Sequence, residues 1–513
     1  MRVPCATLAR VTNAQRVPRK RARQGAEPPV DAIPASLASS PPHRTEAVST
    51  AFSAGELASL TTGRLLRTSS RPVRGAAVDS RLVSPGELFA ALAGERTDGH
   101  RFLADAVKAG AAGLLVSEAP SPAELDSLGD VSVVLLPDVT AGLGTLAAAW
   151  RARFSPLVVG VTGSIAKTST KEAAAAVLAR RFKTLRNEGN QNNEIGLPLT
   201  ILRLGPEHEA AVLEMGMYAG GEIAELARIA QPRIGVVTAV LGVHLSRLGT
   251  IDAIERAKGE LVEALPSDGR AVLNADDERV ARMARRTQAP SLTYGFSEDA
   301  DVGAESVASL GTEGMRFILR AAGEQTEVAT PALGRHGVHN ALAGAAVGIA
   351  AGLRLDEVAE GLATGWSAPH RGELSHAGGM TVLDDSYNAS PVSMRAALEL
   401  LAALPGRHVA VLGEMRELGD LAEPGHREVG AVAAGIADLL VVVGAEAAGI
   451  AEGARAAGFP RHRIVAVADR DAALDALLER LRPGDAVLVK ASRGVELDRL
   501  VDVLLERLRR GGA

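Results

Sequence analysis

Residues 157–168 read LVVGVTGSIAKT, and this stretch carries the strongest indication of the fold. Its apolar run at 157–161 is too short for a helix and rich in β-branched residues, so it predicts a buried strand. A polar turn that contains glycine follows, and a helical stretch begins at Lys167. This order of strand, turn and helix is the one in which backbone N–H groups at a helix N-terminus bind phosphate.

The turn between Gly160 and Thr168 has the chemistry of a phosphate-binding loop. Lys167 supplies a positive charge, and the hydroxyl of Thr168 is suited to Mg²⁺. The full G-x-x-x-x-G-K-[ST] pattern is absent, because Val161 and Ala166 occupy its two glycine positions. A glycine-bearing turn between a strand and a helix is more often structural than catalytic. A nucleotide site therefore needs support from elsewhere in the chain.

Three further apolar runs predict that this strand belongs to a larger sheet. They lie at 211–213, 234–240 and 271–273, and a helix-length segment separates each from the next. Strands that alternate with helices indicate a parallel sheet covered on both faces. The sequence therefore predicts a central P-loop-type α/β domain, for which we expect the bounds 154–367.

A second alternation of strands and helices fills the C-terminal part of the chain, after a linker rich in Pro, His and Gly at 366–372. The predicted strands lie at 381–383, 409–412, 439–443, 464–467 and 486–489. Helical stretches such as 393–404 and 471–481 lie between them. This pattern is typical of a doubly wound, Rossmann-like α/β domain, which we expect to span 368–513.

The N-terminal part divides into an extension and a small α/β domain. Residues 1–50 contain seven Arg or Lys residues before the first acid, Glu27, and we expect this extension to be disordered and dispensable. It lacks the apolar segment of a secretory signal, although an organelle transit peptide or a start codon assigned too early would have a similar composition. Short strands and helices, with turn sequences at 84–86 and 97–100, predict a domain at 51–153. The 513 residues accommodate these three domains.

Composition limits the kinds of partner that the protein can bind. Aromatic residues make up 3% of the chain and the formal net charge is -5. Neither base-stacking platforms nor a general attraction to nucleic acid or anionic lipid is therefore expected. A single cysteine, Cys5, cannot form an internal disulfide or a thiol-ligated zinc site. No apolar run reaches the length of about 18 residues that spans a membrane, so we expect a cytoplasmic protein that binds small molecules.

Three polar residues near predicted strand ends are candidates for the same site as the loop. Glu214 follows the strand at 211–213, at the edge where parallel sheets bind ligands, and its carboxylate suits Mg²⁺. His244 follows the next strand, and Lys258 lies on a helix beyond it. Taken singly, Glu214 fits a solvated loop acid equally well, and an isolated His or Lys is usually packed or solvated. Their significance depends on whether the fold brings them together.

Six short motifs outside the loop give the chain a specific resemblance. They are Asp79-Ser80-Arg81, Asp98-Gly99-His100, Asn192-Asn193-Glu194-Ile195-Gly196, Gly337-Val338-His339-Asn340-Ala341, Asp384-Asp385-Ser386-Tyr387-Asn388-Ala389 and Val411-Leu412-Gly413-Glu414-Met415. Together with the loop, they make the chain from residue 52 onward similar to the Mur ligase family. The resemblance implies three α/β domains: a small UDP-binding domain, a central ATPase domain and a Rossmann-like domain that binds the incoming amino acid or dipeptide.

Within the family, the chain most resembles the member that extends a UDP-N-acetylmuramoyl-tripeptide with D-alanyl-D-alanine in peptidoglycan precursor synthesis. The resemblance implies an ATP-dependent ligase that forms a carbon–nitrogen bond through an acyl phosphate and releases ADP and phosphate. ATP and Mg²⁺ are the implied cofactors. UDP-N-acetylmuramoyl-tripeptide and D-alanyl-D-alanine are the implied substrates, and we expect a monomer with no nucleic acid or membrane partner.

The resemblance also assigns roles to individual residues. For the nucleotide it implies Gly163, Ser164, Ala166, Lys167, Thr168, Ser169, Asn340 at adenine, Arg371 near the γ-phosphate and Asp385 at the ribose. For magnesium it implies Thr168, Glu214, His244 and Lys258, the last as a carbamate that many relatives form. The implied catalytic residues are Lys167, Glu214, His244, Lys258 and Arg371. The implied substrate contacts are Asp79, Ser80 and Arg81 at UDP, with Asn192, Asn193, Tyr387 and Asn388.

Several positions depart from the family's pattern, and most lie near the expected nucleotide. Ala166 replaces a glycine, and its Cβ would crowd the loop if the backbone required a positive φ, whereas a right-handed conformation would accept it. Ala239, Leu241 and Ser246 stand where Asn, Gly and Glu are common, and Ala491 replaces another glycine. Because all the implied catalytic residues remain, we expect an active enzyme.

Three other functions stay open on the sequence. The first is the related ligase that adds the third amino acid to the same precursor, although the third domain has Asp385-Ser-Tyr-Asn388 in place of its Asp-Asn-Pro-Arg signature. The second is folate polyglutamation, which the UDP-site motif at Asp79 disfavours. The third is a catalytically silent protein that binds UDP-sugar or ATP as a scaffold, in line with the departures in the loop.

Overall fold

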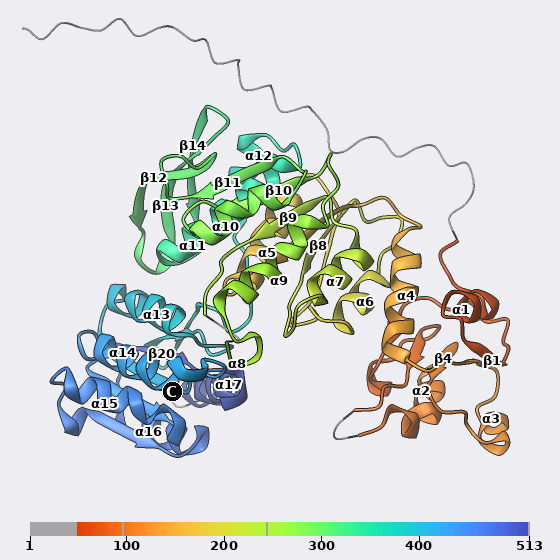
Figure 1. Ribbon diagram of the computed structural model, residues 1–513. Coiled ribbons are helices and arrows are strands. Elements are labelled where there is room, and N and C mark those ends of the chain that lie inside the picture. Colours follow the sequence, from red (N-terminus) through yellow and green to blue (C-terminus); the bar gives the residue numbers. More distant parts are fainter. Residues whose placement is uncertain (1–48, 95–96, 243–244, 511–513) are drawn as a thin grey trace, which may run out of the picture. The chain divides into compact units, whose positions relative to one another are not determined.

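The computed structural model describes residues 49–94, 97–242 and 245–510. Over this part, the chain forms three β-sheets of five, nine and six strands, each with its own helices (Figure 1). The N-terminal extension that was expected to be disordered lies almost entirely outside the described residues. Among the described helices, none has the length and apolar character needed to cross a membrane.

The first sheet is small and mixed. Its strand order is β1-β5-β4-β3-β2, with β1 antiparallel to β5 and the other neighbours parallel. The elements are β1 (Arg64–Arg67), β2 (Ala76–Ala77), β3 (Leu88–Ala90), β4 (Gly113–Val116), β5 (Ser132–Leu135), α1 (Ala54–Leu60), α2 (Leu103–Ala109), α3 (Pro122–Ser127) and α4 (Val139–Arg151). Both predicted turns occur: Glu87 N–H donates to the Ser84 carbonyl at 3.1 Å, and Asp98 caps the short 3-10 helix η2 (Gly99–Phe102).

The central sheet has nine strands in the order β14-β13-β12-β11-β10-β9-β6-β8-β7. They are β6 (Leu157–Thr162), β7 (Thr184–Arg186), β8 (Ala210–Glu214), β9 (Ile234–Val237), β10 (Arg270–Asn274), β11 (Ser291–Gly295), β12 (Val302–Ser309), β13 (Met315–Ala321) and β14 (Glu324–Thr330). The predicted parallel pairing is confirmed for β8, β6, β9 and β10. It extends to β7, β11 and β12, which the apolar runs did not predict. Beyond β12 the pairing is antiparallel, which the apolar runs did not indicate because β12 and β14 expose much of their length to solvent.

Strand β9 is shorter than predicted. The apolar run at 234–240 predicted a strand over its whole length, whereas β9 ends at Val237. The next residue, Thr238, turns its hydroxyl to the loop after β6 and donates to the Ile165 carbonyl at 2.6 Å. Residues 238–240 are buried, so the apolar character of the run reflects packing beneath the loop rather than continued strand pairing.

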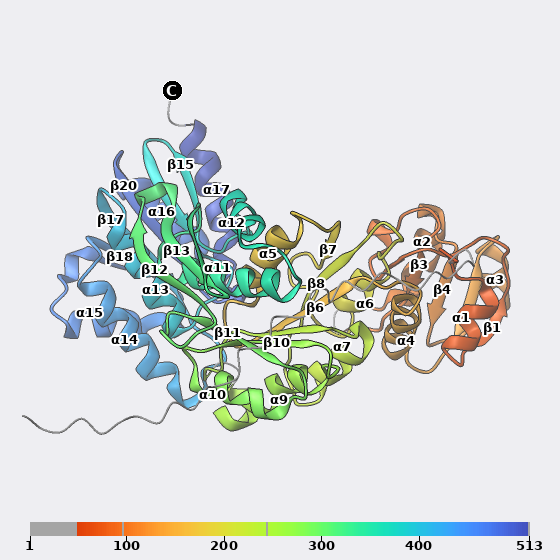
Figure 2. The same cartoon turned by 90° about the horizontal axis from the view of Figure 1, so that it is seen from above.

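Alternate residues of β6 face two separate apolar cores. Val158 belongs to the core that includes α6 (Gly196–Ile201), α7 (Glu222–Ala230) and α9 (Ile251–Glu263). Val159 and Val161 belong to the core that includes α5 (Lys167–Leu178), α11 (Gly334–Ala350) and α12 (Leu355–Thr364). Figure 2 shows these two groups of helices on opposite faces of the sheet. Because both faces are covered, the carboxyl edge of the parallel strands is the place where a ligand can bind.

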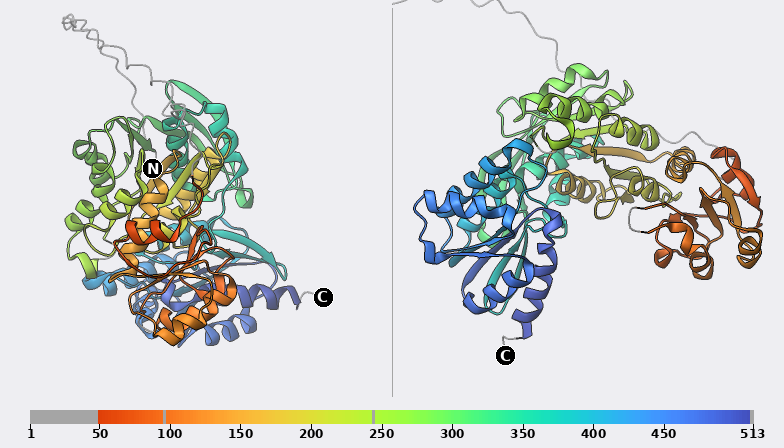
Figure 3. Two further views of the ribbon diagram at one scale, coloured as in Figure 1. Left: turned by 90° about the vertical axis from the view of Figure 1, so that its right-hand side faces the viewer. Right: turned by 60° about the horizontal axis from the view of Figure 1, so that its bottom comes forward.

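The third sheet has six strands in the order β15-β16-β20-β17-β18-β19, parallel except for the pair β15 and β16. They are β15 (Glu373–Ala377), β16 (Met380–Asp384), β17 (Arg407–Gly413), β18 (Leu439–Val443), β19 (Ile464–Val467) and β20 (Asp485–Lys490). The helices α13 (Pro391–Ala403), α14 (Ala422–Ala434) and α15 (Ala448–Ala456) cover one face, and α16 (Arg470–Arg480) and α17 (Leu497–Arg510) cover the other (Figure 3). The doubly wound fold is confirmed, and β18 and β19 have the predicted bounds.

Candidate active site

The loop between β6 and α5 forms a turn with Lys167 folded back over it. Lys167 begins α5, as predicted, and its Nζ donates to the Gly163 carbonyl at 2.9 Å. Burial lowers the pKa of Lys167, the Glu214 carboxylate opposes this shift, and the charge of Arg371 adds to it. In the described part of the chain, the backbone N–H groups of residues 165–168 have no hydrogen-bond acceptor. An ammonium group above a row of such N–H groups is suited to phosphate.

Contacts with the segment after β9 hold the loop in place. Gly163 adopts a φ of 150°, and a Cβ at this position would collide with the Thr238 hydroxyl. Ser164 N–H donates to the Ala239 carbonyl at 2.8 Å, and the Ser164 hydroxyl donates to the Leu241 carbonyl at 3.1 Å. Ala239 and Leu241 therefore brace the loop through backbone atoms, which is why departures in their side chains are compatible with the loop's structure.

Ala166 adopts a φ of 64° and a ψ of 0°, the left-handed conformation in which glycine is expected. The alternative expectation, a right-handed conformation that would accept the Cβ without strain, is therefore wrong. A left-handed conformation costs an L-residue roughly 1–2 kcal/mol. The loop thus keeps the backbone conformation that normally calls for glycine, with local strain in place of the glycine.

Replacing Ala166 by glycine is expected to stabilise the protein. Glycine adopts a positive φ without the steric penalty but loses more entropy on folding, so the net gain in the free energy of unfolding is about 0.5–1 kcal/mol. Urea unfolding followed by circular dichroism measures this gain. The control is Ala176→Gly in the interior of α5, which is expected to lose a similar amount. A loss of stability in both variants would contradict the strain at Ala166.

Glu214 is the last residue of β8, and its carboxylate contacts the loop directly. Its Oε2 accepts a hydrogen bond from the Thr168 hydroxyl at 2.7 Å, and its Oε1 accepts one from the Asn192 amide at 2.7 Å. The Asn187 side chain holds the backbone of Glu214, accepting from its N–H at 2.9 Å and donating to its carbonyl at 3.1 Å. Glu214 is 2% exposed, so its interpretation as a solvated loop acid is wrong.

Lys258 lies on α9 and is almost completely buried, with 1% of its surface exposed. Within the described residues, its ammonium group has neither a hydrogen-bond acceptor nor a carboxylate partner. Burial lowers the pKa of Lys258 well below its ordinary value, and the positive charge of Lys167 lowers it further. The surroundings therefore favour the uncharged, nucleophilic form of this amine.

The oxygen atoms of Thr168 and Glu214 fit a magnesium ion. Mg²⁺ is usually held by one or two protein carboxylates, with water and substrate phosphates as its other ligands. His244, another expected ligand, lies outside the described residues. In the part of the chain that the structure describes, no three His, Cys, Asp or Glu side chains converge on a common point. The fit therefore rests on the Thr168 hydroxyl and the Glu214 carboxylate.

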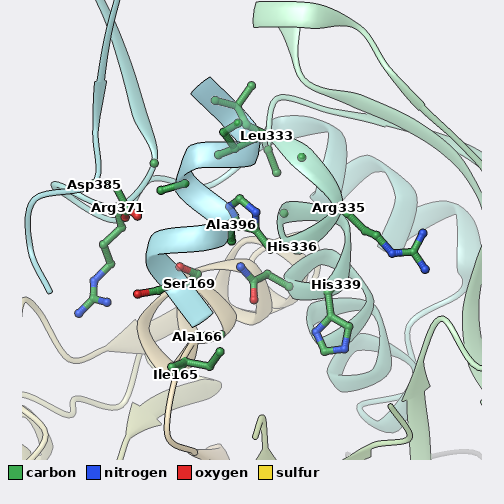
Figure 4. A pocket seen from close by; sticks show the side chains of 18 of the residues that line it. Ile165, Ala166, Ser169, Leu333, Arg335, His336, His339, Arg371, Asp385 and Ala396 are labelled. Atoms are coloured by element: carbon green, nitrogen blue, oxygen red, sulfur yellow. The ribbon is translucent and has the colours of Figure 1, made fainter. Parts of the chain in front are cut away.

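A cavity of about 690 Å³ opens beside the loop (Figure 4). Residues 164–169 line it together with Asn340 of α11, which is 7% exposed, and Asp385, which follows β16. The Asp385 carboxylate pairs with Lys490 at 2.5 Å. Except for Gly163, which does not line it, the residues that were expected at the phosphates, adenine and ribose of ATP thus lie around one cavity.

A second cavity, of about 590 Å³, shares Lys167, Glu214 and Arg371 with the first. It is also lined by residues that were expected at the substrates: Asn192, Asn193, Tyr387 and Asn388. The two cavities therefore meet at the charged residues. This arrangement suits the transfer of a phosphoryl group from a nucleotide on one side to a carboxylate on the other.

Comparison with known proteins identifies the family. Three family models match the chain: "Mur ligase family, catalytic domain" at residues 72–151, "Mur ligase middle domain" at 161–348 and "Mur ligase, glutamate ligase domain" at 370–493. A UDP-N-acetylmuramoyl-tripeptide--D-alanyl-D-alanine ligase of Bacillus subtilis strain 168 is 38% identical over 434 residues, covering 84% of this chain and 92% of that protein. The chain belongs to the Mur ligase family.

Solved structures of Mur ligases have the same fold. A crystal structure of MurF from Acinetobacter baumannii matches with a TM-score of 0.79 and 30% sequence identity, over 90% of this chain and 100% of that one. A MurF ligase from Thermotoga maritima in complex with ADP matches with a TM-score of 0.73 and 29% identity, over 85% of this chain and 98% of that one. The expected three-domain α/β fold is thereby confirmed.

Two histidines of this Mur ligase line the first cavity although the sequence did not predict them there. His336 and His339 lie on α11 (Figure 4), the helix that also carries Asn340. The His339 Nε2 atom lies 3.2 Å from Asn274 Oδ1 and 3.4 Å from the Asp276 carboxylate. His339 belongs to one of the six motifs quoted above. Its contacts with Asn274 and Asp276 join α11 to the end of β10, and the spacing of residues within a motif does not reveal such a contact.

The three residues that were expected at UDP lie in the first domain of this Mur ligase. Asp79 caps the short 3-10 helix η1 (Ser80–Leu82), accepting from the Arg81 N–H at 3.0 Å. The Asp79 carboxylate also pairs with the Arg81 guanidinium group at 2.6 Å. These residues line neither of the two cavities described above. Their contact with UDP stays a prediction.

Proposed function

We propose that this Mur ligase uses ATP and Mg²⁺ to join D-alanyl-D-alanine to UDP-N-acetylmuramoyl-tripeptide in peptidoglycan precursor synthesis. The observation that carries the proposal is the contact of the Thr168 hydroxyl with the Glu214 carboxylate at 2.7 Å, at the place where the two cavities meet. A phosphate loop beside an acidic strand end suits nucleotide phosphates and a magnesium ion. The choice of substrates is supported by the name of the Bacillus subtilis relative.

The proposed reaction has two steps. A carboxylate oxygen of the tripeptide attacks the γ-phosphorus of ATP, the bond between that phosphorus and the β–γ bridging oxygen breaks, and ADP leaves. The amine of D-alanyl-D-alanine then attacks the carbonyl carbon of the acyl phosphate, loses a proton and displaces phosphate. Water would hydrolyse the acyl phosphate, so this intermediate needs a site shielded from solvent until the amine attacks it.

Lys167 and Arg371 supply positive charge for the first step, in which two anions must approach each other. Lys167 begins the helix at the loop, and Arg371 lines both cavities. Fixed charges in such a site stabilise the transferring phosphoryl group without reorganisation. Magnesium, held by Thr168 and Glu214 with His244 as a further ligand, would add to this stabilisation.

Lys258 is proposed to serve the same site as a carbamate. Its uncharged amine nitrogen can attack the carbon of CO₂ and lose a proton, which gives a carboxylate on the lysine side chain. This change would place an anion beside the Lys167 ammonium group, and that pair would be favourable where two ammonium groups are not. The carboxylate would then be a further oxygen ligand for magnesium.

The remaining residues are proposed to position the substrates. Asn340 would contact adenine and Asp385 the ribose, while the Asp79 motif would contact UDP. Four residues that border the second cavity would line the path of the peptides: Asn192, Asn193, Tyr387 and Asn388. We also propose that the enzyme acts as a cytoplasmic monomer with domains at 51–153, 154–367 and 368–513, which sedimentation and limited proteolysis would test.

The function is tested by following phosphate release from ATP with purified protein. Release is expected only when UDP-N-acetylmuramoyl-tripeptide and D-alanyl-D-alanine are both present, because each step consumes one of these substrates. Omission of either substrate is the control. Mass spectrometry should find the pentapeptide product in equal amount to the phosphate.

Other outcomes of the same assay would support the alternatives. Turnover with the dipeptide precursor and a free diamino acid would indicate the ligase that adds the third residue. Binding of ATP or UDP-sugar without turnover would indicate a silent scaffold. Either result would overturn the proposed function.

A further inference from the structure

Two arginines pack against the ring of Tyr387. The guanidinium carbon of Arg371 lies 4.0 Å from the ring centroid, and that of Arg493 lies 5.5 Å from it. All three residues line the second cavity, and Arg371 also lines the first. Arg371 has a proposed role at the γ-phosphate, whereas the role of Arg493 is not accounted for by the reaction described above.

Tyr387 and Arg493 follow adjacent strands at the carboxyl edge of the third sheet. Tyr387 comes after β16 and Arg493 after β20, and these two strands pair in parallel. Next to Arg493, the Ser492 N–H donates to the Glu414 carbonyl at 2.9 Å, and the Ser492 hydroxyl accepts from the Arg416 N–H at 2.8 Å. The backbone beside Arg493 is therefore tied to a third strand end, so the fold fixes the base of this side chain.

Neither Arg371 nor Arg493 has a carboxylate partner among the described residues. The neighbouring Arg416 lines the same cavity but forms an ion pair with Glu414. A guanidinium group stacked on an aromatic ring keeps its in-plane N–H donors available, and these match the two oxygens of a carboxylate. Arg493 thus offers a preorganised position for an anionic group of a substrate.

The upper limit on the spacing of the two arginines leaves room for a dipeptide between them. Their guanidinium carbons cannot be farther apart than the sum of their distances from the Tyr387 centroid, and an extended dipeptide measures about 7 Å. If the proposed function holds, the dipeptide amine attacks near Arg371, where the acyl phosphate forms. We propose, on the basis of that function, that Arg493 binds the C-terminal carboxylate of the incoming dipeptide.

The cavity in which Arg493 lies favours the dipeptide over a nucleotide phosphate. Arg493 borders the second cavity with Asn192 and Asn193, and it does not border the first, which Asn340 and Asp385 line. A carboxylate held at this point would also select for peptides of the correct length, because a longer peptide would carry its carboxylate past the guanidinium group.

The test compares D-alanyl-D-alanine with D-alanyl-D-alaninamide, which lacks the carboxylate, in steady-state assays of phosphate release. The wild type is expected to prefer the free acid. Arg493→Gln is expected to raise the KM for the free acid about tenfold to hundredfold, with a much smaller change in kcat, and to leave the KM for the amide unchanged. Arg493→Lys keeps the charge without the paired donors and is expected to retain part of the preference.

Two other arginines serve as controls. Arg499→Gln removes an exposed guanidinium group that pairs with Glu496 at 3.1 Å, and it should leave both KM values unchanged. Loss of the preference for the free acid in Arg416→Gln but not in Arg493→Gln would place the carboxylate site at Arg416 and overturn the proposal. A rise in the KM for the UDP precursor alone, with the preference intact, would also overturn it.

The design separates failure of the inference from failure of the proposed function. A wild-type enzyme that turns over D-alanyl-D-alanine, and whose preference for the free acid survives in Arg493→Gln, refutes the inference alone. A wild-type enzyme without turnover on either dipeptide refutes the proposed function, and the inference with it. Circular dichroism of Arg493→Gln verifies that any change in KM arises in a folded protein.

Discussion

Lys167→Ala is expected to lower turnover by a factor of about a thousand or more. Lys167 holds its ammonium group over the loop, with Nζ 2.9 Å from the Gly163 carbonyl, where two cavities meet. Without this charge, the γ-phosphate and the attacking carboxylate would face each other with less compensation in the transition state. Phosphate release with both substrates present measures the loss.

Lys183→Ala is the matched control for this variant. Lys183 is an exposed lysine of the same domain, so its removal changes the net charge equally without touching the loop. Its turnover should equal that of the wild type. Circular dichroism should show the same secondary structure in both variants. Full activity of Lys167→Ala would contradict the nucleotide site at this loop.

Lys258→Met is expected to combine a loss of turnover of about a hundredfold or more with a gain in stability. Methionine has a similar length, so it fills the same space on α9 without burying an amine that has no partner among the described residues. Turnover falls because the carbamate, and with it a magnesium ligand, can no longer form. Phosphate release and urea unfolding of the same preparation measure the two effects.

The gain in stability is expected to depend on pH. Folding lowers the pKa of Lys258. At pH values between the pKa of the folded state and that of the unfolded state, the unfolded chain therefore binds more protons at this side chain than the folded protein does. The free energy of unfolding of the wild type therefore rises with pH through this range, relative to Lys258→Met. The advantage of the variant is largest below the folded pKa and vanishes above the unfolded one. Urea titrations at several pH values in CO₂-depleted buffer measure it.

Lys171 provides the control for Lys258, because it is equally buried in the same domain but has partners. Its ammonium group donates to the Asn187 carbonyl at 2.5 Å and pairs with Glu172 at 2.9 Å. Lys171→Met removes these interactions and is expected to lose stability. A similar loss in Lys258→Met would contradict the absence of a partner for Lys258 among the described residues. Unchanged turnover would contradict its proposed role at the metal.

Local patterns in the sequence are enough to specify the class of the fold and the position of the loop. Apolar runs of strand length, such as 157–161 and 439–443, lie between helix-length segments, and this local pattern has few alternatives to parallel α/β folding. The start of α5 at Lys167 was predicted because a polar, glycine-containing turn follows the strand. The antiparallel strands β12–β14 were not predicted, because their exposed side chains lack the apolar run that marks a buried strand.

The assembly of the site depends on contacts that appear only in the folded chain. Strand β8 pairs directly with β6 although β7 comes between them in the chain, and this order sets Glu214 opposite Val161 and beside Thr168. The left-handed conformation of Ala166 and the burial of Lys258 likewise appear in the folded structure alone. Local sequence encodes which element forms, whereas contacts across the sheet, burial and charge depend on the order in which distant strands pair.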